Sequence, residues 1–150
     1  MRLLGVDFGD VRIGLAVSDP TGTIARPLRT ITASGSLDEY AAIVAREVFS
    51  LTEEADGLDA LVVGVPRSLD GTPHQQTTRT LAFVESLRKA TVLPVITQDE
   101  RLTSVEAEQR LAIREHDWRK RKKLLDAASA AVILQDYLDE HRSKGADVTD

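Results

Sequence analysis

The 150-residue sequence contains no cysteine and only three histidines. It can therefore form neither a disulfide nor a cysteine-ligated zinc site, and His74, His116 and His141 lack the spacing of metal ligands. Any bound metal must be held by oxygen ligands, which favours Mg²⁺ or Mn²⁺. The chain also lacks an apolar run long enough to span a membrane and an amino-terminal pattern typical of a secretory signal. We expect a cytoplasmic protein with no membrane partner.

Positive charge is scarce, because 19 Lys and Arg residues face 24 Asp and Glu residues, which gives a net charge of -5. This balance argues against a broadly basic surface that coats nucleic acid, although local basic patches remain possible. Hydrophobic residues make up 42% of the chain, enough for the core of one globular domain. We expect this domain over residues 1–142 and a frayed tail at 143–150.

The order of apolar segments predicts an α/β fold. The expected strands are 3–8, 13–18, 24–32, 58–65 and 92–97, and the expected helices are 37–51, 72–89, 103–113 and 124–141. Pro27 suits a strand at the edge of a sheet, because proline cannot donate a ladder hydrogen bond. Short connections between the first three strands and helical crossovers afterwards imply an antiparallel three-strand ribbon continued by two parallel strands. The result is a mixed five-stranded sheet with helices on both faces.

Asp7 interrupts the apolar run of the first strand. Burying a carboxylate there is unfavourable unless the group is paired or protonated. Gly9 and Gly14 flank a short connection to the next strand, which predicts a β-hairpin whose backbone a phosphate or metal could approach. Asp7 therefore either caps the hairpin or belongs to a functional site.

Asp126 is a second anomaly, because helical spacing places it between Ile133 and Tyr137 on the side of the last helix that faces the sheet. An acid in the first turn of a helix is favourable for the helix dipole, but this explains only the residue type. A second inward carboxylate is what a cation shared with Asp7 would require.

Asp99 and Glu100 follow the fifth strand, at the sheet edge where ligands of open α/β sheets collect. They either join the same site or form a surface turn that neutralises Arg101.

A run of five basic residues stands out in this acidic chain. It comprises Arg119, Lys120, Arg121, Lys122 and Lys123 and directly follows Trp118. Basic side chains bind the phosphate backbone, and an exposed indole stacks on unpaired bases. The alternatives are a solvated charge run and a tryptophan packed in the core. We expect the run to contact nucleic acid and Trp118 to pack in the core.

Four stretches closely resemble the YqgF family, also called RuvX: GVDFGDVRIGLAVSD, VVGVPRSLDGT, DERLTSVEAE and KLLDAASAAVILQDYL. They occur in the family's order over nearly the whole chain, from Met1 to Leu138. Members are described as Holliday junction resolvases and as nucleases for the 5′ end of pre-16S rRNA. The resemblance implies an RNase H-like fold and a metal-dependent nuclease that hydrolyses phosphodiester bonds.

The resemblance also implies a site. Carried over by motif, the catalytic acids are Asp7, Glu100 and Asp126, and the ligands of Mg²⁺ or Mn²⁺, in a two-metal arrangement, are these three with Asp99. The arginines Arg12, Arg67 and Arg101 lie in loops expected near the acids, where they either hold phosphate oxygens or act as counterions. Asp70 either contacts substrate or only forms the turn. The expected substrate contacts are therefore Arg12, Arg67, Asp70, Arg101 and the basic run 119–123.

The biological substrate has two candidates, pre-rRNA and branched or single-stranded DNA. Paired nicking of a four-way junction requires a twofold dimer, yet the expected helices leave no apolar stripe for a large interface. We therefore expect a monomer or weak homodimer that processes pre-16S rRNA, with junction resolution as the alternative. Two other classes remain. One is an ATPase, because the hairpin DFGDVRIG also resembles actin-like and sugar-kinase ATPases, although these need two such domains. The other is a non-catalytic ribosome-assembly module, which would show no metal-dependent cleavage.

Overall fold

The computed structural model describes residues 1–67, 73, 75–100 and 118–149, and in the last range it describes side chains at 126–142. Five strands form one sheet: β1 (Leu3–Phe8), β2 (Arg12–Ser18), β3 (Ala25–Thr32), β4 (Ala60–Pro66) and β5 (Val95–Glu100). Their spatial order is β3-β2-β1-β4-β5, antiparallel from β3 to β1 and parallel from β1 to β5. The predicted mixed sheet is confirmed, with Pro27 on an edge strand.

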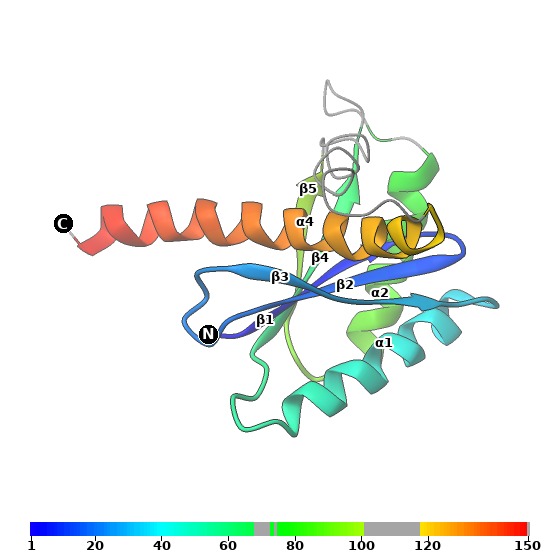
Figure 1. Cartoon of the computed structure of the whole chain (residues 1–150), viewed down its shortest axis with the longest axis horizontal. Helices are drawn as coiled ribbons and strands as arrows, with labels where there is room; N and C mark the ends of the chain where they lie inside the picture. Colours follow the sequence, from blue (N-terminus) through cyan, green and yellow to red (C-terminus); the bar gives the residue numbers. More distant parts are fainter. Residues whose placement is uncertain (68–72, 74, 101–117, 150) are drawn as a thin grey trace.

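Helices cover both faces of the sheet, as predicted (Figure 1). The helices α1 (Leu37–Thr52) and α2 (Gln75–Ala90) share one face, and α4 (Trp118–Thr149) crosses the other. Alternation along β1 divides its side chains between two cores. Leu4, Val6 and Phe8 belong to the core under α1 and α2, whereas Leu3 packs beneath α4. Asp7 therefore points to the α4 side.

Glycines let α4 lie very close to the sheet. A Cβ at Gly14 would lie 2.0 Å from the backbone oxygen of Asp126, and one at Gly5 would lie 2.8 Å from the Cβ of Leu134. On β4, a Cβ at Gly64 would come within 2.4 Å of Ile133. Three neighbouring strands thus use glycine where the helix crosses them. The part of α4 held against the end of β1 is the turn around Asp126, which is the third turn of the helix and not the first turn expected from the sequence.

Both ends of β5 differ from the sequence-based expectation. β5 begins at Val95, after Pro94, and Val92 is fully exposed. The strand continues to Glu100, because its last three residues pair with Gly64, Val65 and Pro66 of β4. The helix expected at 103–113 lies outside the described residues.

The last helix is also longer than expected. α4 begins at Trp118 and continues to Thr149, so that it includes the basic run and residues expected as a tail. No proline interrupts this stretch, and Figure 1 shows the end of the helix extending beyond the sheet.

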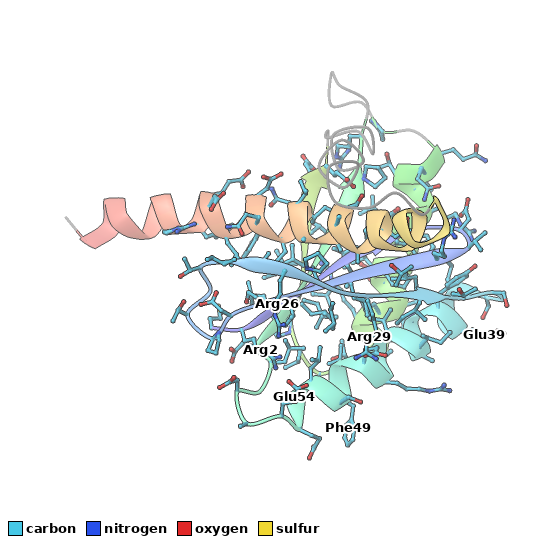
Figure 2. All side chains as sticks on the ribbon, viewed as in Figure 1. Arg2, Arg26, Arg29, Glu39, Phe49 and Glu54 are labelled. Atoms are coloured by element: carbon cyan, nitrogen blue, oxygen red, sulfur yellow. The ribbon has the colours of Figure 1, made fainter. Side chains whose placement is uncertain are left out.

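Arg2 fixes the connection between α1 and β4 to the start of β1. Its side chain is almost fully buried, donates to the backbone oxygen of Gly57 at 3.0 Å and pairs with Glu54 at 2.9 Å. Figure 2 shows Arg2 and Glu54 at this end of the molecule, with Phe49 pointing away from the body. No helix in the described part of the chain is both long and apolar enough to cross a membrane.

We predict that Gly14→Ala destabilises the fold by about 1–3 kcal/mol or more, as overpacking of a tight contact does. The new methyl group would overlap the backbone of Asp126, so this turn of α4 must move. Chemical denaturation measures the change. A variant as stable as the wild type would show that α4 does not rest on Gly14.

Candidate active site

The candidate site lies on the α4 side of the sheet, where β1 ends. Asp7 pairs with Gly14 across the β1–β2 ladder, and Gly14 is the residue that the backbone of Asp126 covers. The two carboxylates are close enough that Asp126 raises the pKa of Asp7. The predicted proximity of Asp7 and Asp126 in space is thus present, although the two residues are 119 positions apart in the chain.

Arg12 is the counterion of Asp126. Its Nε lies 3.0 Å from Oδ2 of that carboxylate, and both side chains are about 30% exposed. Of the two roles expected for Arg12, the structure shows the ion pair. A guanidinium also has further donors beyond the one that binds Asp126, so the pairing leaves Arg12 able to contact a phosphate as well.

The alternation of side chains along β5 places Glu100 and Asp99 on opposite faces of the sheet. Ile96 belongs to the core beneath α4, so alternation places Glu100 on that face and Asp99 on the opposite one. The carboxylate of Glu100 lies near Gly64 and interacts electrostatically with Asp7. Asp99 instead pairs with Arg67, its Oδ1 lying 3.0 Å from Nε, and its side chain is 58% exposed. The structure therefore brings Glu100, and not Asp99, to the side of Asp7.

The acids at this edge resist ionisation. Burial, with a further contribution from the charge of Asp126, raises the pKa of Asp7 to about 7. Burial also raises the pKa of Glu100 to about 8, aided by Asp7 and then by Asp136 on α4. Each carboxylate thus disfavours the charge of the next, as expected where acids gather without a cation.

Oxygen ligands at such a site suit a hard divalent cation. Among the residues that the structure describes, no three Asp, Glu or His side chains are arranged as a complete metal site. The donor chemistry nevertheless fits Mg²⁺ or Mn²⁺, because Asp7 and Glu100 offer carboxylate oxygens and a positive ion would offset the repulsion that raises both pKa values.

Several predicted residues lie elsewhere or outside the description. Arg67 is on the α2 side with Asp99, and its backbone N–H donates to the backbone oxygen of Glu100 at 3.2 Å. Asp70 and Arg101 lie outside the described residues, and so do the side chains of Trp118 and of the basic run 119–123.

One pair near the site was not predicted. Asp10, in the β1–β2 turn, accepts from Nε of Arg79 on α2 at 2.7 Å. The two residues are 69 positions apart, and neither breaks a hydrophobic pattern in the way that Asp7 does. Only the tertiary packing of α2 against the turn relates them.

Solved structures with the same fold include nucleases that act on branched DNA. RuvC of T. thermophilus, in complex with a Holliday junction substrate, is 18% identical with a TM-score of 0.52, covering 95% of this chain and 96% of that chain. The resolvase of fowlpox virus, in complex with Holliday junction DNA, is 14% identical with a TM-score of 0.56, covering 93% and 98%. At these identities the likeness shows the fold alone. The RNase H-like prediction is confirmed.

Sequence relatives are much closer. A protein of Thermoanaerobacter pseudethanolicus named "Putative pre-16S rRNA nuclease" is 40% identical over 96% of this chain and 100% of its own length. One of Lactobacillus acidophilus with the same name is 38% identical over 95% of this chain and 99% of its own. Residues 1–140 match the family described as RuvX, Holliday junction resolvase. The resemblance seen in the four motifs is thereby confirmed, and the chain belongs to the RuvX family.

Proposed function

We propose that this protein is a divalent-metal-dependent nuclease that acts in the cytoplasm on the 5′ end of pre-16S rRNA. The observation that carries the proposal is that Asp7 on β1 interacts electrostatically with Asp126 on α4 and with Glu100 on β5, on the α4 side of the sheet. A fold that buries mutually repelling acids pays in stability, and a catalytic role explains why it does so.

Asp7 and Glu100 would hold the cation, with Asp126 as a third ligand. Asp99 would take no part, because it lies on the opposite face of the sheet and pairs with Arg67. When bound, Mg²⁺ or Mn²⁺, as one ion or a pair, supplies Lewis acidity for in-line attack of water on a phosphodiester. The net reaction forms a bond from the water oxygen to phosphorus and breaks the bond to the 3′ oxygen, which leaves with a proton.

The chain's own residues prepare this reaction. In the absence of metal, pKa values of about 7 and 8 leave Asp7 partly and Glu100 mostly protonated near neutral pH, so ion binding would release protons. Arg12 holds Asp126 in place through the 3.0 Å ion pair and faces the same edge, where its remaining donors can orient a phosphate.

The basic run supports a polymeric substrate. It occupies the first turns of α4, so with a rise of 1.5 Å per residue its backbone lies within about 11 Å of Asp126 along the helix axis. A strand held there by its phosphates would be close to the acids.

The names of the relatives favour RNA, because proteins named for pre-16S rRNA match this chain over nearly its full length. The family description keeps the Holliday junction as the second candidate substrate. A single acid site suffices to trim an RNA end, whereas junction resolution requires two sites in a dimer. We propose a monomer or weak homodimer.

Cleavage is expected to depend on Asp7. Asp7→Asn should lower Mn²⁺-dependent cleavage of a labelled pre-16S 5′ fragment at least about a hundredfold, since loss of groups that only support metal ligands already costs 10–100-fold. Asp126→Asn should act similarly, and the double variant should be no worse than either, because one site is removed once. A labelled four-way junction is the second substrate. Preferential, symmetric cutting of the junction by a stable dimer would contradict the RNA assignment.

The free energy of unfolding should decrease as the pH rises when metal is absent. Asp7 and Glu100 have pKa values above their ordinary range in the folded chain, so between about pH 4 and pH 8 the unfolded state loses its protons first and gains relative stability. Asp7→Asn or Glu100→Gln should therefore raise the Tm in EDTA at pH 8, by about 2–4 °C for each kcal/mol, and have little effect at pH 4. Mn²⁺ should stabilise the wild type more than either variant.

Asp99→Asn is the matched control, because its carboxylate is on the opposite face. Asp99→Asn should not raise the Tm in EDTA at pH 8. Equal stabilisation by Asp99→Asn and Glu100→Gln would contradict the assignment of Glu100 to the site.

Replacing Arg119, Arg121 and Lys123 with Ala should weaken binding of single-stranded RNA with little sequence preference. Each lost phosphate contact reduces the slope of log affinity against log salt by about 0.7 to 0.9. Fluorescence anisotropy across a salt series measures the slope. The control is Arg46→Ala with Lys89→Ala, which removes exposed charges from α1 and α2. An unchanged slope in the triple variant would show that the basic run faces away from substrate.

A further inference from the structure

A polar cavity lies beside the β1–β2 turn, away from the α4 face. It has a volume of about 590 Å³, and the described residues that line it are Asp10, Gln75, Gln76 and Arg79. Three of these belong to the first turns of α2, and Asp10 belongs to the turn. None of them is among the acids or arginines assigned above to metal binding or cleavage.

The cavity wall is held in place by several contacts. Arg79 binds Asp10 at 2.7 Å and lies over the ring of Phe8, with its guanidinium carbon 5.7 Å from the ring centroid. Phe8 in turn stacks on Phe83 with centroids 4.4 Å apart. The hydroxyl of Tyr40 donates to the backbone oxygen of Asp10. A side chain fixed on two sides in this way presents its remaining donors in a defined direction.

The charge of the cavity disfavours a phosphate. Arg79 is the cation among the described lining residues, and the carboxylate of Asp10 already balances it. What the lining offers instead is a mixed set of hydrogen-bond groups, with donors and acceptors on the two glutamine amides, further donors on the guanidinium and acceptors on the carboxylate. Such a set matches the edge of a nucleobase, and glutamine and arginine are side chains that read base edges.

The cavity is also close to the acids. Asp10 follows Asp7 by three residues, so their Cα atoms lie within about 11 Å of each other. Asp7 faces α4, and its neighbour Phe8 faces α2 and supports Arg79. The turn that joins β1 to β2 therefore lies between the two sites. A strand crossing the sheet edge would pass from one to the other.

We propose that this cavity binds an unpaired nucleobase of the substrate strand, next to the phosphate cleaved at the acids, and that Gln75, Gln76 and Arg79 determine which base is accepted. The inference rests on the proposed nuclease function. Sequence-specific recognition of RNA acts mostly on unpaired bases that are turned out of the stack, which is the state that an open polar cavity can receive.

The test uses short, fluorescein-labelled, single-stranded oligoribonucleotides of uridine in which one position is varied to A, C, G or an abasic site. Anisotropy in EDTA measures binding without cleavage. The wild type should prefer one base at one position by about tenfold, the size of a well-formed base contact. The Gln75→Ala/Gln76→Ala variant should lose this preference and keep its affinity for the abasic strand.

Thr78→Ala is the control, because Thr78 is exposed on the same turns of α2 and does not line the cavity. It should keep the preference. Arg79→Lys retains the charge but not the fork of donors, and it should weaken discrimination with little change in Tm. Cleavage of the preferred strand on addition of Mn²⁺ should map within one or two nucleotides of the preferred base.

The failures are distinguishable. If the wild type binds and cuts RNA with no base preference, or if the double variant keeps the preference, the base-binding site is wrong while the nuclease stands. If the wild type binds none of the strands, the proposed function is contradicted as well.

Discussion

The close contact of α4 with the sheet is the constraint on which the site depends. Asp126 reaches Asp7 only because Gly14, the ladder partner of Asp7, has no side chain between the helix and the strand. Gly5 and Gly64 extend this contact across the neighbouring strands. A larger residue at Gly14 would push the turn of α4 around Asp126 away from the sheet and separate the two carboxylates. Packed interiors have little room to yield. The geometry of the chemistry is therefore set by backbone packing.

That contact has an electrostatic cost. It places Asp7 where burial and Asp126 both oppose its ionisation, and Glu100 experiences the same from burial and from Asp7. Arg12 compensates the charge of Asp126 through the 3.0 Å ion pair. In the proposed site, a cation would neutralise the other two. One arginine would then stabilise the metal-free fold without removing the electrostatic attraction for metal.

Much of this arrangement could be predicted from the sequence, and the reasons are local. Asp7 was visible because it breaks an apolar strand, Pro27 because it cannot serve a central ladder, and Asp126 because helical spacing turns it inward. The division of the sheet into an antiparallel ribbon and two parallel strands followed from connection lengths. Each of these signals can be recognised within one element or between sequence neighbours.

What could not be predicted depends on pairing between distant segments. Asp99 and Glu100 are adjacent, and only the register of β5 on β4, which carries the strand through Glu100, decides that Glu100 faces the other acids. The sequence pattern ended that strand too early because its last residues are polar. The ion pair of Asp10 with Arg79 joins a turn to a helix 69 positions away and leaves no periodic trace in either.

The side chains on both faces of β1 border a proposed site. Asp7 and Phe8 are consecutive, so the alternation of a strand sends one to α4 and the other to α2. The first takes part in a cluster of acids, and the second supports the guanidinium beside the polar cavity. On the proposed path, a substrate strand would meet the acids on one side and the two glutamines with the Asp10–Arg79 ion pair on the other. Under the two proposals, cleavage and base recognition would vary independently, because none of the described residues that line the cavity also belongs to the acid cluster.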